Sequence, residues 1–235
     1  MNAMILAAGF GARLRLLTDK IPKALVPIGG EPILGIVLNK LIRCGFTHIA
    51  VNAHHHADQV RDFLADFTTE KNVHLFYSYE PVILDTGGGI KKMLTFFTDS
   101  KAPILVHNVD ILSDINFRDL MHYHARARAA ATLVVNKRQT DRPLSFTDQL
   151  EFIGRSRKDV KSGDTREYGF CGIQVIQPTL FRDIKRDRFY SIDVYVNAAR
   201  EKEKIIAYDF SDCYWRDIGT IDDLALAERD FRKEL

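Results

Sequence analysis

The chain has 235 residues, of which 46% are hydrophobic and 27% are charged, and its formal net charge at pH 7 is +2. A chain of this length and composition can bury a substantial core as one α/β domain, or as one domain with a small lobe. The nearly balanced charge argues against broad nucleic-acid or membrane-surface binding, which would need a basic surplus, so any basic patch should be local.

Cysteine usage and the N-terminal residues indicate the compartment. Cys44, Cys171 and Cys213 lie far apart and form no C-x-x-C pair, which favours reduced thiols over a disulfide framework or a metal site. The opening stretch M-N-A-M-I-L-A-A-G-F-G is too short and has the wrong flanks for a signal peptide. No apolar run approaches the ~18 residues of a membrane span. We therefore expect a soluble, cytoplasmic protein.

Strand-like and helix-like segments alternate along the first part of the chain. Short apolar runs predict strands at 3–8, 47–52, 73–78 and 103–110, and apolar residues at helical spacing predict helices at 31–45, 57–67, about 87–97 and 116–129. Regular succession of strand, helix and strand predicts a mostly parallel, Rossmann-like sheet with helices on both faces.

The alternation changes after residue 130. A strand at 131–137 precedes a stretch at 141–170 that predicts antiparallel strands joined by loops. The remaining expected elements are a strand at 168–176, two helices, a strand near 204–210 and a final helix from Thr220. The chain contains no internal repeat, low-complexity tract or long linker, so we predict one α/β domain over 1–235 with a small antiparallel portion.

The segment A-A-G-F-G-A-R-L-R-L-L-T-D-K-I-P-K, residues 7–23, combines glycines with cations directly after the first predicted strand. Backbone N–H groups around Gly9 and Gly11 can line a concave anion site that larger side chains would block. Arg13 offers a planar fork suited to phosphate oxygens. Pro22 favours an extended residue before it, so Lys23 should project from a stiffened strand. The pattern predicts a phosphate-binding loop.

Two common phosphate-binding loops do not fit this segment. The dinucleotide fingerprint G-x-G-x-x-G needs a third glycine where Leu14 stands, and the P-loop needs Gly-Lys-Ser/Thr, which is absent. The segment resembles instead the N-terminal motif of the sugar-phosphate nucleotidyltransferases, roughly A-A-G-x-G-x-R-L-x-P-L-T-x-x-x-P-K-P-L-x-P. Leu16 and Ala24 replace two of its prolines, which should affect loop stiffness more than chemistry.

A second motif, L-D-T-G-G-G-I at 84–90, places three consecutive glycines at the start of a predicted helix. Such a run favours the close approach of something flat or charged, although an unliganded helix N-terminus is the alternative explanation. The family's base-recognition segment has the form L-x-T-G-G-G. The resemblance implies that Asp85, Thr86 and Gly87 face the nucleobase, with Ala8 and Gly9 opposite.

Two distant aspartates match the family's metal ligands. Asp110 ends the run I-L-V-H-N-V-D, which resembles V-N-G-D, and Asp217 lies in Y-W-R-D-I-G-T, which resembles W-x-D-x-G-T. The resemblance implies that both hold Mg²⁺, and that Asn108 and Gly172 contact the sugar-phosphate substrate. Val109 stands where glycine is usual, so its side chain should occupy space beside the substrate.

The resemblance covers nearly the whole chain and implies a reaction in which an NTP and a sugar 1-phosphate give an NDP-sugar and pyrophosphate. Residues 1–130 would form the nucleotide-binding half and residues 131–235 the sugar-phosphate-binding half. The attacking phosphate oxygen is already ionised, so no protein nucleophile or general base is needed. Lys23 would bridge the two phosphates, and Arg13 with the glycine-loop N–H groups would stabilise charge on the departing pyrophosphate. Mg²⁺ would bind the α-phosphate and the sugar phosphate together.

Substrate choice and two rival functions stay open. The short chain and L-D-T-G-G-G-I look most like family members that transfer uridylate to N-acetylmuramate 1-phosphate, so UTP is favoured. Members that transfer guanylate to mannose 1-phosphate, and heptose-phosphate relatives, share the same motifs. One rival is a cytidylyltransferase acting on phosphocholine or another alcohol phosphate, and another is a catalytically silent nucleotide-binding subunit. Aromatic residues that could surround a quaternary ammonium are Tyr168, Phe170, Tyr190, Tyr195 and Trp215.

Other conspicuous polar residues are expected to be structural or solvated. Adjacent histidines point in different directions, so His54–His56 favour a solvated loop over a metal site, with contact to ligand as the alternative. His122 and His124 lie on a polar helical region and should be exposed. Asp217 could instead cap the final helix, but Thr220, followed by acidic residues, is the better cap.

Overall fold

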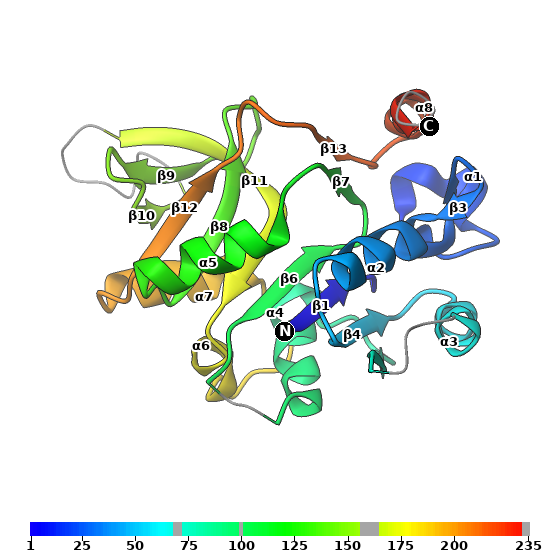
Figure 1. The fold of residues 1–235 in the computed structure, drawn as a ribbon, viewed down its shortest axis with the longest axis horizontal. Helices are drawn as coiled ribbons and strands as arrows, with labels where there is room; N and C mark the ends of the chain where they lie inside the picture. The colour runs from blue at the N-terminus through cyan, green and yellow to red at the C-terminus, as the bar shows by residue number, and fades with distance from the viewer. Residues whose placement is uncertain (68–71, 99–100, 156–164, 232–235) are drawn as a thin grey trace.

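A central mixed sheet organises the computed structural model, which describes residues 1–67, 72–98, 101–155 and 165–231 (Figure 1). The sheet has nine strands: β1 (Asn2–Leu6), β4 (His48–Ala53), β5 (His74–Tyr79), β6 (Ile104–Asn108), β8 (Ala131–Asn136), β9 (Leu144–Thr147), β10 (Phe152–Gly154), β11 (Thr165–Ile176) and β12 (Ile205–Asp209). Seven of them follow the order β10-β9-β11-β6-β1-β4-β5, while β8 pairs with β11 and β12.

The sheet is parallel on one side and largely antiparallel on the other. Strands β5, β4, β1 and β6 are mutually parallel, so Leu6, Asn52 and Asn108 come level at their carboxyl ends. Strand β11 runs antiparallel to β6, β8 and β9, and β9 is antiparallel to β10. The predicted α/β fold with a small antiparallel portion is confirmed.

Helices and two small ladders complete the chain. The helices are α1 (Arg15–Thr18), α2 (Ile33–Arg43), α3 (Ala57–Asp66), α4 (Asp85–Met93), α5 (Phe117–Ala127), α6 (Thr179–Arg182), α7 (Ser191–Arg200) and α8 (Ile221–Phe231), with short 3₁₀ turns at η1 (Ala12–Leu14), η2 (Lys23–Leu25) and η3 (Leu94–Phe96). The ladders pair β2 (Pro27–Ile28) with β3 (Glu31–Pro32), and β7 (Ile111–Ser113) with β13 (Trp215–Asp217).

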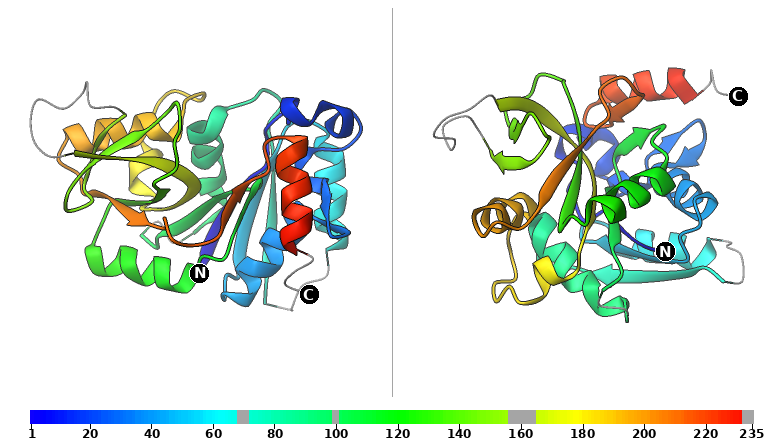
Figure 2. Two further views of the ribbon diagram at one scale, coloured as in Figure 1. Left: turned by 90° about the horizontal axis from the view of Figure 1, so that it is seen from above. Right: turned by 60° about the vertical axis from the view of Figure 1, so that its left-hand side comes forward.

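Side-chain alternation along the strands builds one core on each face of the sheet. In β1, Ala3 and Ile5 pack in one core and Met4 in the other, and all three are 0% exposed. Helices α2 and α5 cover the first core, and α4 and α7 cover the second. Figure 2 (left) shows the sheet between these two layers of helices. This double cover explains why the parallel strands are apolar on both faces.

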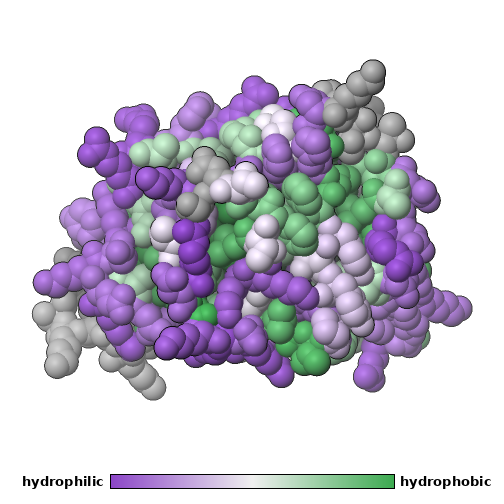
Figure 3. All heavy atoms as spheres, turned by 90° about the horizontal axis from the view of Figure 1, so that it is seen from below, coloured by the Kyte–Doolittle hydropathy of each residue, from purple (hydrophilic) through white to green (hydrophobic). Residues whose placement is uncertain are grey.

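Within the described ranges, no helix combines the length and the apolarity needed to cross a membrane. The face seen from below in Figure 3 has hydrophilic side chains around its rim and apolar side chains gathered towards its middle. Cys44, Cys171 and Cys213 are free thiols, and Cys213 is the exposed one.

Most predicted elements are present, but His124 differs from its expected exposure. His122 is exposed as predicted, whereas His124 is 0% exposed. The reason is helical spacing: His124 shares a face of α5 with Phe117, Leu120 and Met121, which point into the core. Its ring nitrogens are 2.9 Å from Thr132 Oγ1 and 3.3 Å from Gln177 Nε2.

The buried ring makes folding sensitive to acid. Desolvation lowers the pKa of His124 from 6.5 to about 4. The neutral ring therefore contributes its full stability above about pH 6.5, and this contribution is lost as the pH falls towards 4.

We predict that His124→Asn flattens the acid dependence of the free energy of unfolding. Between pH 6.5 and 4 the variant should lose roughly 3 kcal/mol less than the wild type. Urea denaturation at a series of pH values measures this difference, with His122→Asn on the exposed face of the same helix as the matched control. Parallel pH curves for the wild type and His124→Asn would show that the buried ring does not carry the effect.

Candidate active site

An ion pair joins two of the predicted site residues at the carboxyl edge of the parallel strands. Lys23 Nζ lies 2.5 Å from Asp110 Oδ2, although the two residues are 87 positions apart. Lys23 is 8% exposed, which is unusual for a lysine and indicates that the surrounding chain holds its ammonium in place. The predicted convergence of Lys23 and Asp110 is therefore present in the fold.

The backbone around Lys23 differs from the expected stiffened strand. Pro22 is extended, with ψ 149°, and Lys23 then opens the 3₁₀ turn η2. Ala24 and Val26 are 0% exposed and anchor this turn in the core beneath the loop. The expectation was wrong because the apolar alternation after Pro22 buries Ala24 and Val26 through a tight turn rather than along a strand.

A short ladder brings Asp217 to the same edge. Strands β7 and β13 pair antiparallel with Asp217 opposite Ile111, and the Ile218 amide donates to the Asp110 carbonyl at 2.9 Å. Thr220 caps α8 as predicted, since its Oγ1 accepts from the Asp223 amide while the Asp223 carboxylate accepts from the Thr220 amide. Asp217 is thereby free of a capping role.

The electrostatics of Asp217 suit a cation. Burial and the neighbouring Asp110 carboxylate raise the pKa of Asp217, while Lys23 and Arg13 act in the opposite direction. Asp217 Oδ1 is buried and has no hydrogen-bond partner within the described part of the chain. No three His, Cys, Asp or Glu side chains of the described residues converge on one point, so a cation bound here would have two protein carboxylates. Mg²⁺ accepts such a site when phosphates and water supply its other oxygens.

Arg13 lies beside the loop that carries Asp217. Its side chain is exposed, and a Cβ built on Gly219 would fall 2.8 Å from Arg13 Nη1. The guanidinium therefore packs against the backbone of Gly219. Arg13 forms no hydrogen bond or ion pair with any residue that the structure describes, so its planar fork is available to an anion.

The two loop glycines have different roles. A Cβ on Gly9 would meet nothing within 4 Å, so this part of the loop borders open space where a ligand can reach the backbone. Gly11 has φ +63°, and its Cβ would lie 2.8 Å from Thr18 Cγ2 and 3.2 Å from Lys23 Cβ. The loop can fold back on Thr18 only because Gly11 lacks a side chain.

The glycine run in α4 is explained by the chain's own packing. The amides of Gly87 and Gly88 donate to the Phe189 carbonyl at 2.8 and 3.2 Å. A Cβ on Gly88 would lie 2.0 Å from the Asp187 carbonyl oxygen, and one on Gly87 would lie 2.3 Å from the Phe189 ring. The close approach expected from the sequence is thus made by residues 187–189. Contact of Gly87 with a nucleobase stays a prediction.

Asp85 and Thr86 are also held by the segment before α7. The Asp85 carboxylate, on a residue with φ +58°, pairs with Arg188 at 2.8 Å. Thr86 Oγ1 accepts from the Ser191 amide at 2.9 Å. The predicted base-binding segment is therefore braced from the second half of the chain, and its contact with a base stays a prediction.

The predicted sugar-side residues lie against each other. Gly172 has φ +75°, and a Cβ there would fall 2.9 Å from Asn108 Nδ2. The pairing of β11 with β8 shifts register between Phe170 and Gln174, so the strand bends at this point. Val109 is 4% exposed and packs in the core, so its side chain points into the protein rather than, as the sequence suggested, into space open to a substrate.

Comparison with known proteins assigns the family. A family model described as "Nucleotidyl transferase" matches residues 2–146. The chain belongs to the nucleotidyl transferase family. It is 30% identical over 228 residues to an N-acetylmuramate alpha-1-phosphate uridylyltransferase of Neisseria meningitidis, a match that covers 94% of each chain. It is 31% identical over 137 residues to a mannose-1-phosphate guanyltransferase of Hypocrea jecorina, covering 58% of this chain and 38% of that protein.

Solved structures share the fold of this nucleotidyl transferase. A putative glucose-1-phosphate thymidylyltransferase from Bacillus anthracis superposes with a TM-score of 0.82 at 20% identity, covering 99% of this chain and 95% of that one. HddC from Yersinia pseudotuberculosis superposes with a TM-score of 0.79 at 21% identity, covering 98% and 99%. The predicted family, enzyme class and fold are all confirmed.

The histidine loop of the nucleotidyl transferase is half-buried rather than solvated. His54 Nδ1 donates to the Glu80 carbonyl at 2.7 Å, and His55 Nε2 donates to the Thr18 carbonyl at 3.0 Å. The Phe10 ring, 51% exposed, lies 5.1 Å from the His54 ring. The expectation of solvation was wrong because the loop packs between the phosphate-binding segment and the end of β5.

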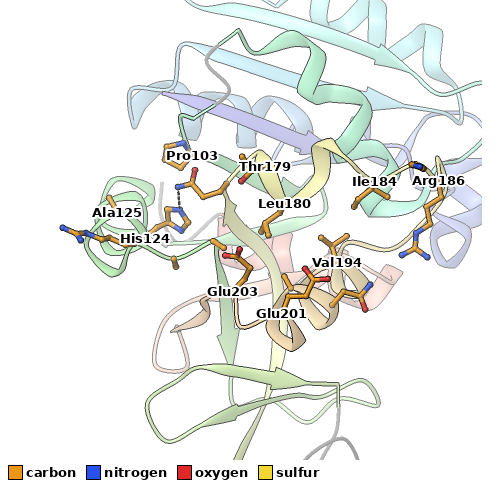
Figure 4. A pocket seen from close by; sticks show the side chains of 17 residues that line it. Pro103, His124, Ala125, Thr179, Leu180, Ile184, Arg186, Val194, Glu201 and Glu203 are labelled. Atoms are coloured by element: carbon orange, nitrogen blue, oxygen red, sulfur yellow. Dashed lines mark hydrogen bonds between the residues drawn. The ribbon is translucent and has the colours of Figure 1, made fainter.

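A groove of about 1100 Å³ lies elsewhere on the molecule (Figure 4). It is bounded by the end of α5, the start of α6 and helix α7. Its lining includes Pro103, which directly precedes β6, so the groove lies at the opposite edge of the sheet from Asp110. The hydrogen bond between His124 and Gln177 forms part of its wall. None of the predicted site residues lines this groove.

Proposed function

We propose that this nucleotidyl transferase moves a nucleotidyl group from an NTP to a sugar 1-phosphate, releasing an NDP-sugar and pyrophosphate. The observation that supports the proposal most strongly is the ion pair of nearly buried Lys23 with half-buried Asp110, beside an Asp217 carboxylate oxygen that has no hydrogen-bond partner among the described residues. Both reactants carry phosphates, so their charges must be neutralised before they can be aligned. The site offers cations and acidic ligands at one edge of the sheet, where substrates commonly bind in such folds.

In the proposed reaction, an ionised oxygen of the sugar phosphate attacks the α-phosphorus in line. A new P–O bond forms, and the bond to pyrophosphate breaks with its electron pair leaving on the pyrophosphate. Lys23 would leave Asp110 and donate to both phosphates, while Arg13 and the amides near Gly9 and Gly11 would stabilise the leaving group. Asp110 and Asp217 would hold Mg²⁺, which when bound supplies Lewis-acid stabilisation of phosphoryl charge.

UTP and N-acetylmuramate 1-phosphate are the proposed substrate pair. The Neisseria meningitidis uridylyltransferase aligns with this chain over 94% of both chains. The Hypocrea jecorina guanyltransferase aligns over only 38% of its own length. A Schizosaccharomyces pombe mannose-1-phosphate guanyltransferase, 29% identical over 93% of this chain, keeps GTP as the second candidate. The UDP-sugar would serve cell-wall or glycan synthesis, and we propose a cytoplasmic location for this NTP-dependent step.

The rival with phosphocholine as acceptor has less support. Of the aromatics that could surround a quaternary ammonium, Tyr168 is 2% exposed and Tyr195 is 0% exposed, so both belong to the core. The Trp215 ring is already covered by the Arg138 guanidinium, 4.2 Å from its centroid. A silent nucleotide-binding subunit is disfavoured because Lys23 and the two aspartates remain together at one site.

We predict that pyrophosphate release is fastest with UTP plus N-acetylmuramate 1-phosphate. A coupled phosphate assay with UTP, GTP, CTP and dTTP, each paired with N-acetylmuramate 1-phosphate, mannose 1-phosphate or phosphocholine, measures the preference. Fastest release with GTP and mannose 1-phosphate would reassign the substrates. Nucleotide binding with no release from any pair would support the silent subunit instead.

We predict that Lys23→Ala lowers kcat by roughly 10²-fold or more, because a preorganised charge stabiliser is lost. Lys23→Arg should also be impaired, since a planar fork cannot replace a compact ammonium at this position. Steady-state kinetics with Lys20→Ala, an exposed lysine on the same loop, provides the matched control. Turnover of Lys23→Ala close to that of Lys20→Ala would exclude Lys23 from the reaction.

A further inference from the structure

Asn52 and Glu80 form a buried polar pair at the carboxyl ends of β4 and β5. Asn52 is 2% exposed and Glu80 is 1% exposed. Asn52 Nδ2 donates to Glu80 Oε1 at 2.6 Å. No lysine, arginine or histidine of the described chain forms an ion pair with Glu80, so neutral donors alone satisfy this carboxylate.

The pair connects the two segments expected to hold the nucleotide. On one side, Asn52 Oδ1 accepts from the Ala7 amide at 2.7 Å, directly before Ala8 and Gly9. On the other side, Glu80 Oε2 accepts from the Leu84 amide at 3.0 Å, at the residue that precedes Asp85. One continuous chain of hydrogen bonds therefore runs from the phosphate-binding loop to the base-binding segment.

Gly89 fits helix α4 directly onto this pair. A Cβ at position 89 would lie 2.7 Å from Asn52 Nδ2 and 2.9 Å from Glu80 Oε1. The third glycine of the run is thus needed for contact with the polar pair, whereas Gly87 and Gly88 face residues 187–189.

We propose that Asn52 and Glu80 are positioning residues that fix the spacing between the loop at 8–11 and the segment at 84–87, and thereby set NTP affinity. The inference rests on the proposed function, in which those two segments bind the nucleotide. Because both side chains are buried, they act through the amides of Ala7 and Leu84. Neither side chain touches a substrate in this role, and both act through the segments that bind the nucleotide, so a change in either should weaken NTP binding.

The donor and acceptor order of the pair permits a reciprocal test. Glu80→Gln places an amide donor against either Asn52 Nδ2 or the Leu84 amide, and Asn52→Asp places one carboxylate against another. The double variant Asn52→Asp/Glu80→Gln restores every bond. In it, the carboxylate now at position 52 accepts from the Ala7 amide and from the side-chain amide now at position 80, whose oxygen still accepts from the Leu84 amide. Net charge is unchanged in the double variant.

Isothermal titration calorimetry of each protein with UTP, in the presence of Mg²⁺ and without sugar phosphate, measures the change in UTP affinity. Each single variant should bind UTP about tenfold or more weakly, and the double variant should return to within about threefold of the wild type. At saturating UTP, kcat of the double variant should also return to within about threefold of the wild type. Thr132→Val, which removes a buried hydrogen bond to His124 far from the site, is the control for general destabilisation and should bind UTP normally.

The outcomes separate the inference from the proposed function. The positioning role would be overturned, and the proposed function left intact, if the single variants bind UTP as tightly as the wild type. The same holds if the double variant loses as much binding free energy for UTP as the two single variants together. Absence of UTP, GTP, CTP and dTTP binding by the wild type would overturn both. If a single variant fails to fold, the double variant decides alone, with normal binding expected.

Discussion

The ion pair between Lys23 and Asp110 is the interaction on which the site depends. The protein brings a nearly buried ammonium and two carboxylates to one edge of the sheet, and the ammonium offsets part of the cost of removing the carboxylates from water and of their mutual repulsion. Lys23 compensates Asp110, while Asp217 keeps an oxygen without a hydrogen-bond partner in the described structure. This arrangement leaves carboxylate oxygens that could bind a cation, as the proposed function requires.

The fold supplies this site from both of its halves. Parallel strands deliver Asp110 and the glycine loop to one edge, and the β7–β13 ladder carries Asp217 back from near the C-terminus. The segment at 187–191 braces the start of α4, so residues beyond the parallel sheet hold the predicted base-binding segment. Neither half alone contains the complete site, so the site can form only when both halves are folded together.

The motifs predicted the site better than they predicted the local backbone. The resemblance to the family's motifs predicted that Lys23, Asp110 and Asp217 come together, and the fold brings them to one edge of the sheet, while their roles in catalysis stay a prediction. The β7–β13 ladder was missed because each strand has three residues and too little pattern to recognise. Packing between distant segments could not be predicted from the sequence either. The burial of His124 and the contact of the α4 glycines with residues 187–189 both depend on such packing.

A crystal structure with Mn²⁺ and a non-hydrolysable UTP analogue, in which anomalous scattering locates the cation, tests directly whether Asp110 and Asp217 hold a metal. We expect a Mn²⁺ peak shared by the carboxylates of Asp110 and Asp217. We also expect Lys23 Nζ to move from Asp110 to the phosphate oxygens. A cation bound away from either aspartate, or phosphates out of reach of Lys23, would show that these residues do not form the proposed site.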